Sequence, residues 1–477
     1  MFGPESATLK IGINTVLVSK GLGVGQMQEI FDAAIIGLGP GGEVVADRLL
    51  GAGKKVVMFE SELIGGECSY WACIPSKTIL RGPELRAEAT RAAGVGAVPL
   101  DWDKARAYRD YMARYLDDSA QLKGYQERGA TVVRAHATID GPGKVSADGV
   151  EYLSHHIIVA TGTRPLSPEF PGSEQVSLWG NREVYTLKEL PTSVAIIGGS
   201  AVALEAASFL SGFGVHVTLL NRSARLLGRE EPEIAALAEG YLREAVMDIR
   251  INTSILSALN NGRVNVLKLS DGSELSVDAI IAATGRRPRT DSMGIAQAGG
   301  LLDERGNMQV DEHCWAAEGL WGIGDVTGIM PFTHVAKYQG RVVADCILGK
   351  ERKANYGGIP RVIFSNPEIA AVGLTREQAD KLDIESEYLA ISIPETIARP
   401  WTYEENPRGD LGVLIDVQRQ VMIGAWVMAP QAAEWIHSAA LAIRSQIPLA
   451  TLRDQVAQFP TYTEAYLVAL ERLENTR

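Results

Sequence analysis

The fold is decided by the stretch Phe31-Asp32-Ala33-Ala34-Ile35-Ile36-Gly37-Leu38-Gly39-Pro40-Gly41-Gly42. Its apolar half predicts a buried strand, a helical pattern runs from 43 to 51, and residues 55–59 predict a second strand that ends at Glu60. The glycines fit G-x-G-x-x-G: Gly37 permits a tight turn, Gly39 lets the backbone approach a pyrophosphate, and Gly42 allows close helix packing. Glu60 is placed to accept hydrogen bonds from a ribose. The stretch therefore predicts a dinucleotide-binding βαβ unit.

A second copy of this pattern begins at residue 193. Residues 194–197 predict a strand, 198–203 the turn, 204–213 a helix and 215–220 the next strand. Gly198 and Ala203 hold the first and last turn positions, whereas Ser200 replaces the middle glycine and makes close approach of a pyrophosphate less certain. Two fingerprints in one chain predict two bound nucleotides.

The second copy differs from the first where its second strand ends. Asn221 stands in place of an acid, and Arg222 and Arg225 follow. Loss of the carboxylate removes repulsion against a 2′-phosphate, and a nearby arginine can pair with that phosphate. We therefore expect NADP rather than NAD at this site; the alternative is that the arginines are ordinary solvated surface charges.

Further motifs divide the chain into domains. The related segments 157–165 and 280–288 each end an apolar strand with Thr-Gly and Arg-Pro, and a short strand leads to Gly324-Asp325. From 359 onward, alternating strands precede helical stretches at 431–444 and 462–473, which predicts an α+β domain. The fold class is α/β, with two Rossmann-like domains, the second inserted in the first, and an α+β C-terminal domain. The expected bounds are 1–28 for an N-terminal overhang, 29–170 with 290–356 for the first domain, 171–289 for the second and 357–477 for the third.

Two cysteines, Cys68 and Cys73, follow the first fingerprint in the stretch Gly65-Gly66-Glu67-Cys68-Ser69-Tyr70-Trp71-Ala72-Cys73-Ile74-Pro75-Ser76-Lys77. Their spacing permits a bridge if the backbone bends back. Pro75 suits the first turn of a helix, and a helix that starts there would favour a thiolate at Cys73. The alternative is a pair of packed structural thiols.

Composition narrows the functional class. The 477 residues carry a net charge of -12, which argues against a nucleic-acid surface. Only four cysteines occur, so we expect a cytoplasmic protein with one special pair rather than a secreted disulfide scaffold. No apolar run reaches membrane-spanning length, and no signal peptide is recognised in residues 1–28.

Together these motifs resemble the flavoprotein disulfide reductase family, across about residues 29–475. The resemblance implies FAD, an NAD(P) cofactor, no metal and a homodimer whose C-terminal domain completes the partner's active site. Cys73 would be the thiol next to the flavin and Cys68 the outer thiol, with Lys77 near the flavin and Glu205 paired to it. The implied cofactor-binding residues are Gly37, Gly39, Gly42, Glu60, Thr161, Gly162, Gly324, Asp325 and His334, and, on the NAD(P) side, Gly198, Ala203, Arg222 and Gly285.

One position departs from the family pattern. Disulfide-reducing members end with His-Pro-Thr and a glutamate five residues after the histidine, but here Phe459 stands at the histidine position while Glu464 is kept as a catalytic candidate. Phenylalanine carries no proton, and loss of an acid–base group costs about 10²–10⁴-fold in such steps. The stretch 459–466 instead resembles that of the soluble pyridine-nucleotide transhydrogenase.

The resulting expectation is an FAD-dependent NAD(P)H oxidoreductase, similar to dihydrolipoyl dehydrogenase. Hydride would pass from NAD(P)H through FAD to a Cys68–Cys73 disulfide and on to a small-molecule electron acceptor, with no nucleic-acid or membrane partner. Two alternatives use no thiol exchange: NAD(P) transhydrogenation, and reduction of a quinone or a metal ion. A non-enzymatic alternative is a flavoprotein that acts as a redox sensor.

Overall fold

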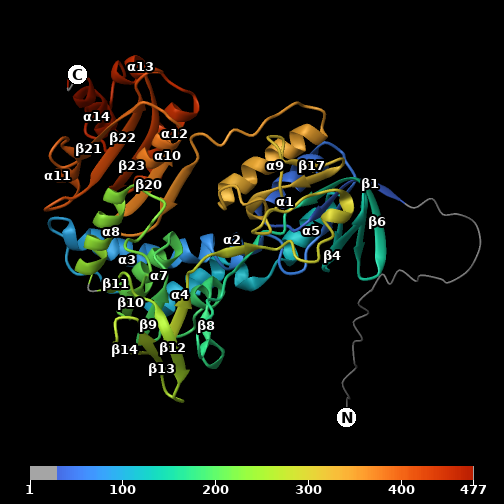
Figure 1. Cartoon of the computed structure of the whole chain (residues 1–477), viewed down its shortest axis with the longest axis horizontal. Helices are drawn as coiled ribbons and strands as arrows, with labels where there is room; N and C mark the ends of the chain where they lie inside the picture. The colour runs from blue at the N-terminus through green and yellow to red at the C-terminus, as the bar shows by residue number, and fades with distance from the viewer. Residues whose placement is uncertain (1–28, 246, 476–477) are drawn as a thin grey trace, which may run out of the picture.

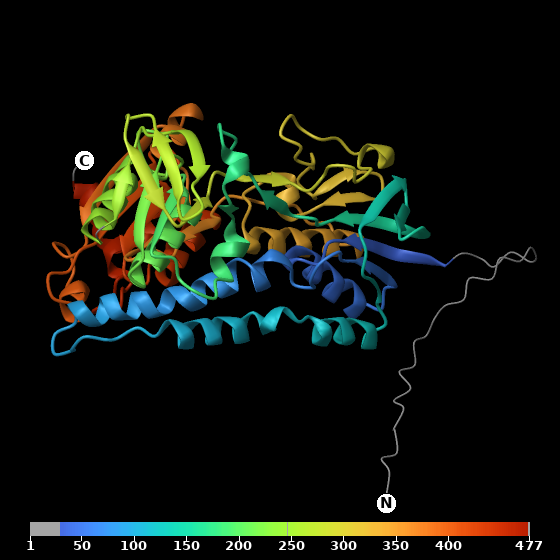
Figure 2. The ribbon, with the colours of Figure 1, turned by 90° about the horizontal axis from the view of Figure 1, so that it is seen from below.

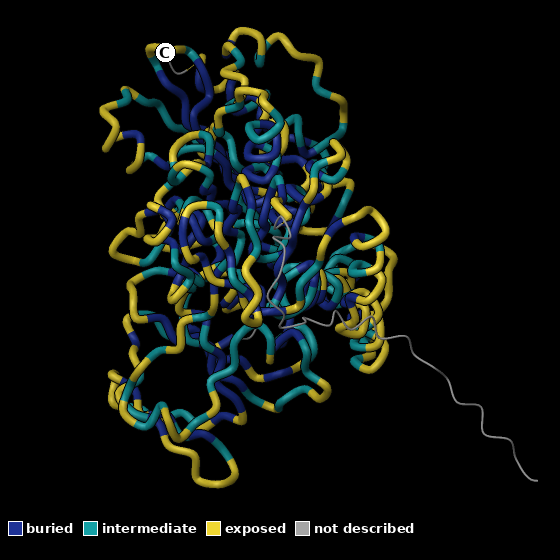
Figure 3. Tube along the Cα trace, turned by 90° about the vertical axis from the view of Figure 1, so that its right-hand side faces the viewer, coloured by how far each residue is buried: buried dark blue, intermediate teal, exposed yellow. Residues whose placement is uncertain are grey.

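A computed structural model describes residues 29–245 and 247–475, so the expected overhang 1–28 lies outside the described residues. The chain forms two mainly parallel sheets, each with helices packed on it, and a third, antiparallel sheet at one end of the molecule (Figure 1). In Figure 3 the buried segments lie inside and the exposed ones form the outer loops. The α/β class with an α+β C-terminal domain is confirmed.

The first sheet is built around β1 (Ile30–Ile36), whose residues 33–35 are fully buried. The strand order is β17-β18-β6-β1-β2-β3, and β1 pairs in parallel with β2 (Val56–Phe59) and β6 (Val150–Val159). Because both faces are covered, β1 is apolar throughout its second half. The other strands of this sheet are β3 (Thr131–Val133), β4 (Ala137–Gly141), β5 (Lys144–Ala147), β17 (Trp315–Ala317) and β18 (Leu320–Gly322).

Two helices meet beside the first Gly-rich turn. Helix α1 (Pro40–Gly51) begins directly after Gly39, three residues earlier than the sequence pattern predicted, because Pro40 fits the first helical position. Helix α9 (Thr333–Ile347) packs against it, and a Cβ added at Gly340 would lie 2.7 Å from Gly41 O. The small residues therefore let the two helices approach closely.

The second sheet has the order β11-β10-β9-β15-β8, and its pairs are parallel. Helix α7 (Ala201–Gly212) connects β9 (Ser193–Ile197) to β10 (His216–Leu220). The antiparallel ribbon of β7 (Thr163–Pro165) and β16 (Arg286–Pro288) lies where the chain leaves the first sheet and returns to it, as an inserted domain requires. The remaining elements here are β8 (Leu178–Trp179), α6 (Asn181–Tyr185), α8 (Pro232–Glu244), β11 (Asp248–Arg250), β15 (Ala279–Ala282) and the three-stranded sheet β12 (Ile255–Asn260), β13 (Asn265–Leu269) and β14 (Glu274–Val277).

The third sheet is wholly antiparallel, in the order β19-β20-β23-β22-β21. Its central strand β23 (Val421–Ala429) is buried at every position. The sequence missed β21 (Ser386–Ser392), an edge strand whose side chains are mostly half-buried and give little alternation. The other elements are β19 (Pro360–Ile363), β20 (Glu368–Gly373), α10 (Arg376–Lys381), α11 (Arg399–Tyr403), β22 (Asp410–Asp416), α12 (Ala432–Arg444), α13 (Leu449–Arg453) and α14 (Glu464–Asn475).

Helix α3 (Cys73–Arg91) connects the first sheet to the rest of the molecule. Figure 2 shows it running along one side of the molecule beside the helical row formed by α4 (Trp102–Met112) and α5 (Ser119–Glu127). Pro83 of α3 packs so closely on α7 that a Cβ at Gly212 would overlap it. The helix that begins at Cys73 is thus fixed against the second domain.

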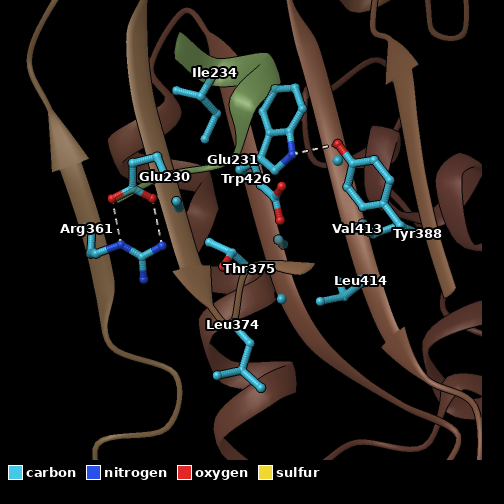
Figure 4. A pocket seen from close by; sticks show the side chains of 14 residues that line it. Glu230, Glu231, Ile234, Arg361, Leu374, Thr375, Tyr388, Val413, Leu414 and Trp426 are labelled. Atoms are coloured by element: carbon cyan, nitrogen blue, oxygen red, sulfur yellow. Dashed lines mark hydrogen bonds and ion pairs between the residues drawn. The ribbon is translucent and has the colours of Figure 1, made fainter. Parts of the chain in front are cut away.

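Ion pairs connect the second domain to the C-terminal domain, among them the pair of Arg361 with Glu230 drawn in Figure 4. Arg361 of β19 donates two hydrogen bonds to Glu230, at 2.9 and 2.8 Å. Arg376 pairs with Glu231 at 3.0 Å and with Glu233. The acids come from the segment that leads into α8 and from the first turn of this helix, so the position of α8 depends on the C-terminal domain.

Candidate active site

The first Gly-rich turn has the geometry that a dinucleotide needs. Gly37 has φ +98°, and a Cβ there would lie 2.5 Å from Ala160 O, so no other residue fits. A Cβ at Gly42 would overlap Gly37 O, whereas one at Gly39 would meet no protein atom within 4 Å. The turn is therefore packed against protein on two sides and open at Gly39, next to the N-terminus of α1, where a pyrophosphate would bind.

Glu60 lies at the end of β2 with its carboxylate fixed against this turn. One oxygen accepts a hydrogen bond from Leu38 N at 2.8 Å and the other accepts one from Glu62 N, also at 2.8 Å. Burial raises the pKa of Glu60, although these two hydrogen bonds oppose the shift. A carboxylate has lone pairs left after two such bonds, so Glu60 can still accept from a ribose hydroxyl.

Asp325 lies in the short helical turn Gly324–Thr327 that follows β18. Its Oδ2 accepts a hydrogen bond from Thr163 Oγ1 at 2.8 Å, and Arg286 Nε donates to the same hydroxyl at 2.7 Å. Burial raises the pKa of Asp325. Thr161 donates to Arg289 O at 2.8 Å, and Gly162 has φ +68°. These residues lie where β6 and β18 end, the edge at which an α/β sheet binds its ligand.

His334 lies in the first turn of α9. The residue before this helix is Phe332, so no side chain at the N-cap position accepts a hydrogen bond from the first backbone N–H groups. The His334 ring stacks on that of Phe332 with 5.1 Å between centroids, and its Nε2 contacts Pro360 O at 3.0 Å. The imidazole thus faces the first residue of β19, at the edge of the third sheet. The first backbone N–H groups of α9 remain the part of this segment suited to a cofactor.

The two cysteines lie at the junction of α2 (Gly66–Tyr70) and α3. Cys73 is the first residue of α3, two positions earlier than predicted from Pro75. Both cysteines are half-buried free thiols. Cys73 Sγ lies 3.3 Å from Thr333 Oγ1. The pair therefore contacts the N-terminal turns of two helices, α3 and α9.

The two thiols differ in acidity: the pKa of Cys73 is lowered and the pKa of Cys68 is raised. A hydrogen bond from Cys68 lowers the pKa of Cys73 to about 6, with the Thr333 hydroxyl and the charge of Lys77 adding to this effect against burial. The pKa of Cys68 is raised, chiefly because its proton is held by Cys73 and secondly by burial. When the pair carries one negative charge, that charge is therefore favoured on Cys73 rather than on Cys68.

Lys77 and Glu205 form the predicted pair. Lys77 Nζ donates to Glu205 Oε2 at 2.7 Å, and Glu205 Oε1 accepts from Phe364 N at 3.1 Å. The Lys77 ammonium also lies 4.7 Å from the centre of the Phe364 ring. Since α3 carries both Cys73 and Lys77, one helix positions the thiolate and the ammonium together.

The second Gly-rich turn resembles the first. Gly198 has φ +119° and Gly285 has φ +129°, and Ala203 is buried. Ser200 Oγ donates to Ala283 O at 3.2 Å, so its hydroxyl is bonded to the neighbouring strand end. The turn therefore keeps the backbone path of the fingerprint despite the serine.

The loop after β10 carries the arginines predicted to select the nucleotide. Asn221 donates to Ser223 O at 3.0 Å and to Arg225 O at 2.9 Å, and so holds the loop in shape. Arg225 donates to Gly228 O at 3.0 Å. Arg222 is exposed and forms no ion pair with any residue that the structure describes. Its guanidinium is available to an anion, whereas Asn221 is already engaged.

The C-terminal motif lies apart from the cysteines of its own protomer: α14 is at the outer end of the third domain and α2 is in the middle of the molecule (Figure 1). The helix begins at Glu464, two residues later than predicted. Phe459 is 69% exposed. Glu464 Oε2 is buried without a hydrogen-bond partner in the described chain. An exposed aromatic ring and a buried acceptor at one edge fit a surface that another subunit covers.

Sequence reasoning missed a charged network beside the cysteines. Arg182 of α6 donates to Glu62 at 2.8 and 2.7 Å and to Glu67 at 2.7 Å, and its guanidinium stacks on the Trp71 ring at 4.0 Å. Arg289 adds a 3.3 Å contact to Glu62. The acid Glu67 directly before Cys68 is visible in the sequence, but its partner Arg182 lies 115 residues further along the chain and is brought to it only by the fold. Thr333 was also missed, since it touches Cys73 from 260 residues away.

The residues present fit FAD and a pyridine nucleotide: two Gly-rich turns, the first open at Gly39, an acid at the end of β2 and a half-buried aspartate at the ligand-binding edge of the first sheet. Among the described residues no group of His, Cys, Asp and Glu could hold a metal ion. None of the described helices is long and apolar enough to cross a membrane.

Comparison with known proteins agrees with this geometry. The family model described as pyridine nucleotide-disulphide oxidoreductase matches residues 31–340, and the dimerisation domain of that family matches 359–470. A mercuric reductase of Streptomyces lividans is 32% identical over 456 residues, covering 92% of this chain and 96% of that protein. A dihydrolipoyl dehydrogenase of Thermus scotoductus is 31% identical over 456 residues, covering 93% and 97%.

A solved structure with the same fold is the HOCl-induced flavoprotein disulfide reductase RclA from Escherichia coli. It has a TM-score of 0.82 and 27% sequence identity, covering 92% of this chain and 99% of that one. The chain belongs to the pyridine nucleotide-disulphide oxidoreductase family and is an FAD-dependent NAD(P)H oxidoreductase acting on a sulfur group.

Proposed function

We propose that this enzyme transfers electrons from NADPH through FAD and the Cys68–Cys73 pair to a small-molecule disulfide. The observation that carries the proposal is geometric: one helix, α3, carries both Cys73 and Lys77, and Lys77 Nζ donates to Glu205 of α7 at 2.7 Å. FAD, when bound, supplies the chemistry that accepts a hydride and delivers two electrons to a disulfide. If electrons passed directly from FAD to the acceptor, the Cys68–Cys73 pair would have no role in turnover.

The proposed roles of the residues follow from their positions. Glu205 fixes the Lys77 ammonium beside the cofactor edge, and that ammonium, with the N-terminus of α3, stabilises the thiolate of Cys73. Cys68, the outer sulfur, attacks the acceptor disulfide, which forms Cys68–S–S–R and releases one thiolate. Cys73 then attacks the Cys68 sulfur, which restores the Cys68–Cys73 disulfide and releases the second thiolate. Two electrons thus leave the protein, and the Cys68 proton goes to solvent or to a leaving thiolate.

NADPH is preferred over NADH in this proposal. Support comes from the neutral Asn221 at the end of β10 and from the exposed, unpaired Arg222 within the described chain.

The cytoplasm, where thiols stay reduced, is the proposed compartment, in keeping with the free thiols Cys314 and Cys346. The proposed domain bounds are 29–170 with 290–356 for the first domain, 171–289 for the second and 357–477 for the third. We also propose a homodimer in which Glu464 faces the partner's active site.

A second candidate function is transfer of electrons directly to NAD⁺ or a quinone. It is favoured by Phe459, whose exposed ring occupies the position of a proton carrier. The experiment that separates the two measures NADPH oxidation with a small disulfide, a quinone and thio-NAD⁺, for wild type and Cys68→Ser. The first function predicts disulfide turnover that Cys68→Ser abolishes. Turnover only with quinone or thio-NAD⁺, unchanged in Cys68→Ser, would support the second.

A further inference from the structure

The span between the two cysteines contains a break between two helices. Helix α2 ends at Tyr70 and α3 begins at Cys73, so Trp71 and Ala72 join them. Ala72 has φ -138° and ψ -98°, and it stands at the N-cap position of α3 without a side chain that could accept a hydrogen bond. The angle between the two helices is therefore not fixed by a cap, and contacts from other segments must fix it.

The two helices are attached to different parts of the molecule. In α2, Tyr70 is fully buried and its hydroxyl donates to Ile64 O of the first domain at 3.0 Å. In α3, Lys77 donates to Glu205 of α7 in the second domain at 2.7 Å. The distance between the two sulfurs thus depends on how these two attachments are held relative to each other.

Two consecutive residues of the second domain, Asn181 and Arg182, contact both ends of the span. Arg182 Nε donates to Glu67, the residue before Cys68, at 2.7 Å. Its guanidinium lies 4.0 Å from the centre of the Trp71 ring. Asn181 Nδ2 donates to Glu67 Oε2 at 2.9 Å and to Trp71 O at 2.8 Å, so both hydrogens of one amide group are used on this span. We call Asn181 and Arg182 the interdomain clamp.

The interdomain clamp is itself fixed to the first domain. Arg182 donates to both carboxylate oxygens of Glu62, at 2.8 and 2.7 Å. Asn181 Oδ1 accepts from Arg286 Nη1 at 3.2 Å, and Arg286 Nη2 donates to Thr163 O at 2.9 Å. The side chain of Arg182 is 30% exposed, so solvent competes only partly for these contacts. The clamp therefore relates the attachment of α2 to that of α3.

We propose that Asn181 and Arg182 are positioning residues that keep Cys68 beside Cys73 and so favour the disulfide over the dithiol. The proposal rests on the proposed function, because it assumes that the pair is redox-active. Two thiols held side by side have a high effective concentration toward each other. When the dithiol reduces glutathione disulfide, the protein S–S bond forms, the glutathione S–S bond breaks and two glutathione thiols are released. Loosening the clamp lowers the effective concentration and shifts this equilibrium toward the dithiol.

The test measures the equilibrium of the FAD-loaded enzyme with anaerobic glutathione buffers at neutral pH, with the thiols trapped by alkylation and counted by peptide mass spectrometry. For Arg182→Gln we expect the equilibrium constant for disulfide formation to fall about tenfold, which raises the reduction potential of the pair by about 30 mV. Asn181→Ala removes no charge and should raise the potential as well. Arg243→Gln, which removes a guanidinium paired with Glu239 of its own helix, should leave the potential unchanged.

The direction of the shift separates positioning from charge. If Arg182 acted only by stabilising a thiolate, its loss would destabilise the dithiol and lower the potential. A lowered or unchanged potential in Arg182→Gln would overturn the proposal, as would an unchanged potential in Asn181→Ala or an equal rise in Arg243→Gln. The equilibrium needs neither NADPH nor the acceptor. The proposed function fails separately, if Cys68→Ser still reduces a small disulfide.

Discussion

At the scale of single residues, the site depends on how one proton is shared by two sulfurs. The hydrogen bond from Cys68 and the charge of Lys77 lower the pKa of Cys73 to about 6. A thiol with a lowered pKa is ionised above that value and protonated below it. The reduced enzyme should therefore lose the Cys73 thiolate as the pH falls through about 6. Thiolate ultraviolet absorbance, measured as the difference between wild type and Cys73→Ser, checks this midpoint; a midpoint near 9 would contradict it.

The choice of nucleotide also belongs to this scale. Replacing Arg222 with glutamine removes the exposed cation beside Asn221, and should raise the KM for NADPH by about tenfold with little effect on the KM for NADH, since one charge-assisted phosphate contact contributes about 1–2 kcal/mol. Steady-state kinetics with both nucleotides measures the effect. Arg263→Gln, an exposed arginine between β12 and β13, is the matched control. Equal losses with NADPH and NADH would refute the assignment.

At the scale of elements, α3 must pack tightly on α7 to hold Cys73 and Lys77 in place. A Cβ at Gly212 would overlap the Pro83 ring, so Gly212→Ala should lower the free energy of unfolding by about 1–3 kcal/mol. Gly240→Ala in α8 is the control, because its Cβ would meet nothing within 4 Å and alanine favours a helix by about 0.5–1 kcal/mol. Thermal unfolding should move in opposite directions for the two variants. A stabilised Gly212→Ala protein would show that the contact is loose.

The sequence predicted elements well where the chemistry is local. Gly37 and Gly198 adopt positive φ angles, and a Cβ at Gly42 would overlap Gly37 O. These requirements arise within the turns themselves, so the strand–turn–helix units were predictable from the sequence. The predicted helix starts were displaced by three and two residues, because Pro40 itself is the first residue of α1, whereas Pro75 lies two residues inside α3. Contacts such as Cys73–Thr333 and Arg182–Glu67 join distant segments, and no spacing in the chain encodes them.

At the scale of the whole molecule, the second domain is connected to the third by the ion pairs that Arg361 and Arg376 make with acids at the start of α8. Arg376→Ala would leave the buried Glu231 without its cation, and should destabilise the protein by about 1–3 kcal/mol. The loss should be measured by denaturant unfolding. Arg419→Ala, whose arginine is half-exposed and lies 3.8 Å from Asp416, should cost less than 1 kcal/mol. Equal effects would mean that the interdomain pair is dispensable.

In the proposed function, electrons leave the enzyme through Cys68 and Cys73. The most direct test is an anaerobic titration of the FAD-loaded protein with NADPH, comparing wild type with Cys68→Ser. Since FAD and a disulfide each accept two electrons, we expect wild type to take up about twice as many equivalents of NADPH as the variant. Equal uptake by the two proteins would contradict it, because the cysteine pair would then hold no electrons.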